Sequence, residues 1–171
     1  MRWLRVLLIV LATAGWAVWL VLVPFIAASR SGDVAVLASA LTYRAGSVIC
    51  HQQTERSWYV AGVQMPVCAR CTGLYAGAPI GAAVMAVWLW RPGAAGRVRP
   101  ALPLTPLRVA VALSGAPTLA LWAAEHLIGM PVSNSLRAAG AALFGAAVAG
   151  VVTAWAGGAS FEDTPPATAI H

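Results

Sequence analysis

The sequence predicts an all-α fold: a single bundle of membrane-spanning helices with no separate soluble domain. Two observations support this prediction. The chain of 171 residues is 60% hydrophobic and only 9% charged, and its apolar residues fall into long runs. A soluble domain is nearer half apolar and a quarter charged. Because small domains bury a low fraction of their surface, this chain cannot hide so much apolar surface in its own core. We therefore expect a lipid bilayer as its solvent.

Four apolar runs are each long enough to cross the roughly 30 Å of membrane hydrocarbon, which takes about 20 helical residues. These runs cover residues 4–28, 72–90, 107–128 and 136–155. The first run is longer than the core of a cleaved signal peptide, so we expect it to be a retained span. The sequence thus predicts one membrane domain over residues 1–171, with a loop at 29–71 and a tail at 156–171.

A further apolar stretch, residues 34–50, leaves a five-span alternative open. Arg44 lies in its second half, and Thr42 and Tyr43 precede that arginine. We interpret this stretch as a helix that lies on the membrane surface or packs against the bundle.

The placement of the arginines predicts the orientation. Arg2 and Arg5 precede the first span, and a cluster lies between the second and third spans: Arg91, Arg97, Arg99 and Arg108. The positive-inside rule places both segments in the cytoplasm. Four spans then put both termini in the cytoplasm and residues 29–71 and 129–135 outside. We expect a multi-pass protein of the bacterial inner membrane.

The net charge of +6 favours contact with anionic lipid head groups, because the arginines are scattered through the short segments between spans. They form no basic stripe and no recognition motif, so we expect the lipid bilayer, and no nucleic acid, as a partner. A periplasmic or membrane protein is the other kind of partner that fits this topology.

Small residues predict which spans pack closely. Gly73, Gly77 and Gly81 recur every four residues on one face of the second span, and the fourth span has a similar surface with Gly140 and Gly145. Small residues at this spacing let helix backbones approach closely in lipid. We expect the second and fourth spans to be in tight contact.

Polar residues gather in two places that the topology puts at the same outer face. The first is C-H-Q-Q-T-E-R-S at 50–57 together with Q-M-P-V-C-A-R-C-T-G at 64–73. The second lies beyond the third span and comprises Glu125, His126, Ser133, Asn134 and Arg137. This coincidence predicts one composite site. Within it we interpret Gln52, Gln53, Glu55 and Gln64 as ordinary loop polarity.

Three cysteines in the outer segment point to metal chemistry. Cys68 and Cys71 have C-x-x-C spacing, with which two thiolates can hold one metal ion or close a disulfide. Cys50 and one histidine would complete a Cys₃His set, a known structural zinc site. His51 is adjacent to Cys50 and His126 competes with it for the fourth position. The leading hypothesis is a site for zinc or another soft metal.

Two other functions stay open for the same residues. In a thiol–disulfide protein, Cys68 and Cys71 would cycle between thiols and a disulfide, with Cys50 resolving or free. In a membrane cysteine hydrolase or transpeptidase, Cys71 or Cys50 would be the nucleophile and His51 or His126 the base. An accessory role, in which the polar cluster only stiffens the bundle, also fits.

The polar residues around the third and fourth spans allow two interpretations. Glu125 and His126 suit an acid–base pair, and Arg137 or Arg70 suits an oxyanion stabiliser. Alternatively, Glu125 and Arg137 form a structural ion pair that locks these two spans together. Ser133 or Asn134 is then the N-cap of the last span.

These motifs resemble a family of small bacterial multi-span membrane proteins that is catalogued as a domain of unknown function. The resemblance rests on C-H-Q followed by R-S, on P-V-C-A-R-C-T-G-x-Y-x-G, and on S-N-x-x-R-x-x-G after an acidic residue. It covers about residues 45–150. It implies a membrane protein with a shared polar constellation.

A looser similarity is to the exosortase-type membrane cysteine peptidases, which combine a cysteine in a C-S-G context, an N-x-x-R motif and a histidine at the outer face. Cys71-Thr72-Gly73, Asn134 to Arg137 and His126 are similar to that set. The order differs, because the histidine precedes the arginine here and follows it in that family.

Overall fold

The structure, a computed structural model, describes residues 1–29, 32–91 and 101–162. Within these ranges the chain forms five α-helices, one 3₁₀ helix and four short strands. In chain order they are α1 (Arg2–Ser29), α2 (Asp33–Ile49), η1 (Thr54–Arg56), β1 (Tyr59–Val60), β2 (Val63–Gln64), α3 (Ala69–Trp90), β3 (Ala101–Pro103), α4 (Leu104–Leu127), α5 (Asn134–Ala156) and β4 (Ser160–Glu162).

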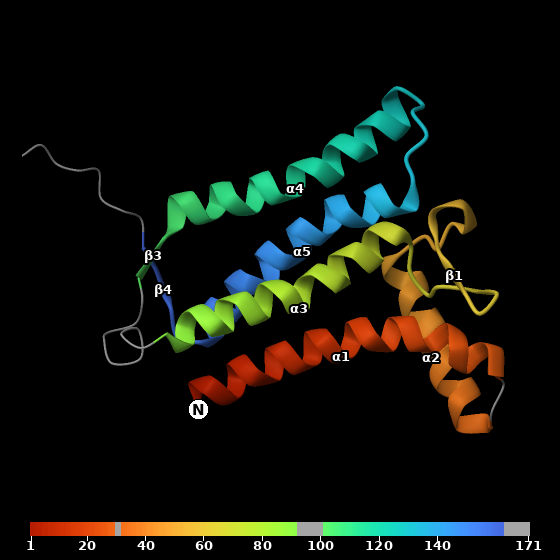
Figure 1. The fold of residues 1–171 in the computed structure, drawn as a ribbon, viewed down its shortest axis with the longest axis horizontal. Helices are drawn as coiled ribbons and strands as arrows, with labels where there is room; N and C mark the ends of the chain where they lie inside the picture. Colours follow the sequence, from red (N-terminus) through yellow and green to blue (C-terminus); the bar gives the residue numbers. More distant parts are fainter. Residues whose placement is uncertain (30–31, 92–100, 163–171) are drawn as a thin grey trace, which may run out of the picture.

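Four of the helices, α1, α3, α4 and α5, are long and apolar enough to cross a membrane. They run side by side along the long axis of the molecule (Figure 1). This arrangement confirms the predicted four-span helical bundle. Of the predicted arginine cluster, Arg97 and Arg99 lie outside the described residues, and so do residues 163–171 of the predicted tail.

Helix α2 lies at the end of the bundle beside the end of α1 (Figure 1). The indole Nε1 of Trp19 on α1 donates a hydrogen bond of 3.0 Å to the hydroxyl of Thr42 on α2. Several apolar side chains of α2 are nevertheless exposed, among them Val34 and Val48. The helix is not among the candidate spans found in the described part of the chain. These findings agree with a helix packed against the bundle, as opposed to a fifth span.

Helices α3 and α5 form the tightest contact in the bundle, as the glycine spacing predicted. A Cβ atom added to Gly73, Gly77 or Gly81 would overlap backbone atoms of α5. A Cβ atom on Gly145 would overlap the backbone of α3 in the same way. The absence of side chains at these positions is therefore what allows the two backbones to touch.

The other helices pack around this pair. Helix α1 lies antiparallel to α3, since the Trp3 ring contacts the Trp90 ring at one end and Trp16 contacts Tyr75 nearer the other, each pair with centroids 6.1 Å apart. Helix α4 packs on α5, where Gly115 contacts Phe144, and leaves most of its surface exposed. Such exposed apolar surface suits a lipid environment.

Two small strand pairs were not predicted. Strands β1 and β2 form an antiparallel hairpin. Its two turn residues, Ala61 and Gly62, both have positive φ, which is the requirement of the type I′ turn that matches strand twist. Strands β3 and β4 pair in parallel, so the segment before α4 is tied to the segment after α5, at the opposite end of the bundle from the hairpin (Figure 1).

Candidate metal centre

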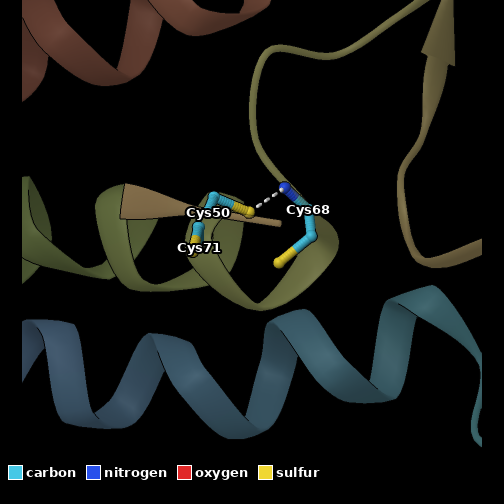
Figure 2. Close-up of side chains that lie close together, drawn as sticks. All are labelled: Cys50, Cys68 and Cys71. Atoms are coloured by element: carbon cyan, nitrogen blue, oxygen red, sulfur yellow. Dashed lines mark hydrogen bonds between the residues drawn. The ribbon is translucent and has the colours of Figure 1, made fainter. Parts of the chain in front are cut away.

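The three cysteines come together at the end of the bundle that carries α2 and the β1–β2 hairpin. Their Sγ atoms all lie within 4.8 Å of one another, and Figure 2 shows the three side chains side by side. A tetrahedral ion with metal–sulfur bonds near 2.3 Å separates its sulfurs by about 3.8 Å. A small contraction of the cluster would therefore let all three sulfurs bind one ion.

Three different backbone positions supply these thiols. Cys50 is the residue at which α2 ends, and its extended backbone turns the chain away from the helix axis. Cys68 is the N-cap of α3, and Cys71 lies in the first turn of that helix. Residues three apart on a helix lie on the same side, which explains why a C-x-x-C sequence at a helix start brings two sulfurs together. The start of α3 at Ala69, three residues earlier than predicted, is what places Cys71 inside the helix.

Hydrogen bonds fix Cys50 relative to Cys68. The backbone N–H of Cys68 donates to the Sγ atom of Cys50 at 3.2 Å (Figure 2). The backbone N–H of Cys50 donates to the carbonyl of Gly46 and closes the last turn of α2. This bond holds the Cys50 sulfur next to the start of α3, where Cys68 and Cys71 lie.

Glutamine side chains brace the loop between these cysteines, a role that the interpretation as ordinary loop polarity missed. The amide of Gln52 donates to the carbonyl of Tyr43 at 3.0 Å and to the carbonyl of Pro66 at 2.6 Å. The amide of Gln64 donates to the carbonyl of Gln52 at 2.6 Å and to the hydroxyl of Ser57 at 3.2 Å. These bonds link the end of α2 to the residues just before Cys68.

The backbone near Gln52 has an uncommon conformation and is closely packed. Gln52 has φ 47, in the left-handed region that non-glycine residues seldom adopt. A Cβ atom on Gly46 would overlap the carbonyl oxygen of Pro66, so α2 and the approach to α3 touch directly. The C-H-Q motif was the one sequence signal that could have singled out Gln52.

Apolar side chains enclose the cluster. Cys50 is 7% exposed and forms a buried cluster with Leu20 of α1, Met65 and Val67. Other partly buried side chains pack against this cluster, including those of Trp58, Val60, Cys68, Cys71 and Tyr75. A low-dielectric surrounding strengthens the attraction between thiolates and a cation.

The environment of Cys68 favours a thiolate. The thiol of Cys71 donates a hydrogen bond to the Cys68 sulfur, and this bond together with backbone N–H groups lowers the pKa of Cys68 to about 5, although burial opposes the shift. The N-terminus of α3 adds its positive end in the same direction. At neutral pH Cys68 is therefore ready to bind a cation.

The two candidate histidines, His51 and His126, are not part of the cysteine cluster. Among the described residues, the group that includes the cysteines contains no other metal-binding side chain within the same 4.8 Å. The ring of His126 stacks on Trp122, with centroids 4.8 Å apart, and its Nε2 atom lies 3.5 Å from Nη1 of Arg56. His51 is exposed. The predicted Cys₃His set thus appears as three cysteines, and histidine as a fourth ligand stays a prediction.

The second polar cluster is an ion-pair network centred on Glu125. Its carboxylate accepts from Arg70 on one oxygen and from Arg137 on the other, and Nε of Arg137 donates to the second of these oxygens at 2.7 Å. The side chain of Glu125 is 5% exposed, and those of Arg70 and Arg137 are 21% and 11% exposed. The predicted ion pair of Glu125 and Arg137 forms, with Arg70 as a second partner of Glu125.

The same network joins three helices and the loop. Nη1 of Arg137 donates to Asn134 at 2.6 Å, and the amide of Asn134 donates to the carbonyl of Ser57 at 3.2 Å. The hydroxyl of Ser133 accepts from the N–H of Leu136 and is the N-cap of α5, as one of the two sequence alternatives proposed. The two polar clusters therefore lie at one end of the bundle, as predicted.

The candidate catalytic residues are divided between these two clusters. Cys71 lies with the other cysteines, whereas Glu125 and Arg137 bind each other. His126 contacts Trp122 through a hydrogen bond from Nδ1 to the carbonyl oxygen, at 2.9 Å. The described structure thus forms no pair of a cysteine nucleophile with a histidine base, the arrangement on which a cysteine hydrolase depends.

Comparisons with known proteins agree with this architecture. The model of a family described as "Predicted membrane protein (DUF2085)" matches residues 50–151, which contain all three cysteines, Gln52, Glu125 and Arg137. No solved structure matches the chain.

Two archaeal relatives share shorter segments. An uncharacterized protein of Methanocaldococcus jannaschii is 46% identical over 43 residues, which are 25% of this chain and 28% of that protein. An uncharacterized protein of Methanothermobacter thermautotrophicus is 53% identical over 30 residues, which are 18% of this chain and 27% of that protein. The matches thus span little more than a quarter of each relative. Both relatives are archaeal, so the bacterial origin stays a prediction.

Proposed function

We propose that this chain, which belongs to the DUF2085 family of predicted membrane proteins, holds one soft metal ion in a site made by Cys50, Cys68 and Cys71. The observation that supports this proposal best is the convergence of the three Sγ atoms within 4.8 Å. Cys50 lies 18 residues before Cys68 in the chain, so only the fold brings it to the C-x-x-C pair. Zinc and monovalent copper are ions that thiolate ligands select.

The surroundings of the cysteines support the same proposal. A structural site needs ligands whose directions are fixed by hydrogen bonds around them. Here the N–H of Cys68 orients the Cys50 sulfur, and Gln52 ties the two chain segments together. A buried thiol that only filled space would not need this bracing.

The proposed location is the outer face of the membrane. The end of the bundle with the cysteines is opposite the end where α1 begins, α3 ends and α4 begins (Figure 1). Those helix ends carry Arg2, Arg5, Arg91 and Arg108. Under the positive-inside rule those arginines are cytoplasmic. The site then lies extracytoplasmically, at the level where the helices leave the bilayer.

Elemental analysis tests this proposal. The full chain is purified in mild detergent without added metal, and its metals are counted per chain by inductively coupled plasma mass spectrometry. Free thiols are counted before and after a chelator. The proposal predicts close to one soft metal ion per chain and thiols that become reactive only after chelation. Three single Cys→Ser variants should each lose the ion, whereas Ser47→Ala, a control at an exposed position on α2, should keep it.

A metal-free protein with three reactive thiols would contradict the proposal. A second candidate function is then thiol–disulfide exchange, which is favoured by the closeness of the Cys68 and Cys71 sulfurs, within 4.8 Å of each other. In that reaction Cys68 attacks a partner disulfide and releases one partner thiolate. Cys71 then closes the intramolecular disulfide, and the second partner sulfur leaves with the Cys71 proton. Two oxidised thiols per chain, with Cys50 reduced, would support this candidate.

A further inference from the structure

Three sulfurs without a fourth ligand make an unusual zinc site. Structural zinc sites are almost always four-coordinate. Among the described residues, the group of metal-binding side chains contains the three cysteine sulfurs and no histidine nitrogen or carboxylate oxygen. The nature of the ion therefore depends on whether another ligand can reach the cluster.

One of the two histidine candidates, His126, has both ring nitrogens in contact with other groups. A carbonyl oxygen only accepts, so Nδ1 of His126 donates to the carbonyl of Trp122 at 2.9 Å. The other ring nitrogen, Nε2, lies 3.5 Å from Nη1 of Arg56. A metal ion on Nε2 would have to displace a cationic guanidinium and break the stacking of the ring on Trp122.

The nearby carboxylate is also engaged. Both oxygens of Glu125 bind arginine side chains, and this carboxylate is almost fully buried between them. Moving it to the cysteines would leave two largely buried guanidinium groups without their anion, which is strongly unfavourable. Glu125 is therefore excluded as a ligand by its role in the network.

The immediate surroundings of the cysteines are soft and apolar. Cys50, Leu20, Met65 and Val67 form one buried cluster, and Met65, a thioether, is 3% exposed. On the buried side of the site, where Cys50 lies, a water ligand would be held beside these apolar groups, and ordered buried water needs several polar partners. The site thus offers three soft donors and a poor place for a hard one.

We infer that the cysteine site binds a monovalent soft cation of the copper(I) type, held by three sulfurs in a trigonal arrangement. A filled d-shell and a single charge allow such an ion to be satisfied by three sulfur donors, whereas zinc(II) would lack its fourth ligand. Metal–sulfur bonds near 2.3 Å in a trigonal plane require sulfur separations of about 4.0 Å. This separation lies within the 4.8 Å limit of the cluster.

The inference rests on the proposed function, since it names the ion for the same three cysteines. Cys68 and Cys71 are only partly buried, so an ion can reach the site from the membrane surface. The site therefore suits transfer of the ion to the thiol ligands of another molecule as well as permanent storage.

Competition titrations test this inference. The reduced full chain in detergent is titrated without oxygen with copper(I) against a copper(I)-specific chelator, with silver(I) as a probe that does not oxidise thiols, and with zinc(II) against a zinc chelator. We expect one copper(I) or silver(I) ion per chain and at least a hundredfold weaker competition by zinc. Replacing one cysteine by serine should weaken copper(I) binding by more than about a hundredfold, because even second-shell changes cost 10–100-fold.

Two histidine variants complete the test. His51→Ala and His126→Ala should keep wild-type copper(I) affinity, because neither ring is a ligand in the inferred site. Tight zinc(II) binding that depends on a histidine would overturn the inference and leave the proposed soft-metal function standing. Failure of all three ions to bind the reduced wild-type chain would reject the proposed function itself. Circular dichroism of each variant checks that the helices are intact.

Discussion

The side-chain amide of Gln52 donates a 2.6 Å hydrogen bond to the carbonyl of Pro66, two residues before Cys68. The same amide donates to the carbonyl of Tyr43 on α2. One side chain thereby couples the helix that ends at Cys50 to the segment that leads into Cys68. We therefore expect the separation of these two thiols to depend on Gln52.

Replacing Gln52 by leucine should therefore weaken metal binding without unfolding the bundle. Leucine has a similar volume but no donor, so the carbonyls of Tyr43 and Pro66 lose their partner. We expect a loss of metal affinity of about 10–100-fold, the range seen when groups that orient ligands are removed. The matched control is Gln53→Leu, since the Gln53 side chain is exposed. Equal affinities for the two variants, measured by chelator competition, would show that Gln52 does not position the site.

Removing the charge of Glu125 should destabilise the bundle. In Glu125→Gln the two partly or largely buried arginines, Arg70 and Arg137, lose the carboxylate that neutralises them. Breaking a buried ion pair by removing one partner costs about 3 kcal/mol or more, which should appear as a lower free energy of unfolding in detergent. Glu55→Gln, at an exposed position, should leave stability unchanged.

A double variant tests whether the lost stability comes from uncompensated arginine charge. Adding Arg70→Gln to Glu125→Gln removes one of the two uncompensated charges, so part of the lost stability should return. If the stability losses of the two single variants simply added up in the double variant, Arg70 and Glu125 would not interact. That result would contradict the ion pair between them.

Placing a methyl group on Gly77 should push α3 and α5 apart. The added Cβ would overlap backbone atoms of Ala142, which cannot move away without shifting a whole helix. Overpacking of this kind costs about 1–3 kcal/mol. Gly15→Ala on α1 is the control, because a Cβ there meets nothing within 4 Å. Thermal unfolding followed by circular dichroism should separate the two variants, and equal midpoints would refute the close helix contact.

Reporter insertions test the proposed topology. Reporters placed at residues 31 and 61 should lie on the same side of the membrane, because the proposed topology has four spans and does not count α2, which lies between them, as one. A reporter within residues 92–100 should lie on the opposite side, together with both termini. A change of side across α2 would establish the five-span alternative and would reverse the orientation of every later segment.

The sequence predicted the four spans well, because hydrocarbon thickness sets the length of an apolar run whatever the tertiary structure. It also predicted the α3–α5 contact and the ion pair of Glu125 with Arg137. Both follow from helical spacing and from the cost of an unpaired charge at membrane depth. The convergence of the three cysteines was predicted as well, from the C-x-x-C pair and a third cysteine in the same loop.

The placement of His126 was harder to predict. Consecutive residues on a helix point about 100° apart. The position of Glu125 in the ion-pair network therefore does not place the next residue, His126, in the same network. His126 lies four residues, about one helical turn, after Trp122. The two side chains are therefore neighbours on the helix surface, and their rings stack.

The role of Gln52 could not be read from its residue type. That role depends on φ 47 and on two carbonyls, at positions 43 and 66, that only the folded loop brings together. The hairpin was missed for a related reason, since its strands have only two residues each and such short segments give little alternation to detect.

X-ray absorption at the edge of the bound metal tests the central claim most directly, because it counts the atoms around the ion and identifies their kind. The protein loaded with one copper(I) ion per chain is measured in detergent under reducing conditions. The inferred site predicts a first shell of three sulfur atoms and no nitrogen or oxygen, supplied by Cys50, Cys68 and Cys71, whose Sγ atoms lie within 4.8 Å of one another. A shell with fewer than three sulfurs would contradict a three-cysteine site, and three sulfurs completed by a histidine nitrogen would contradict the three-coordinate, all-sulfur arrangement.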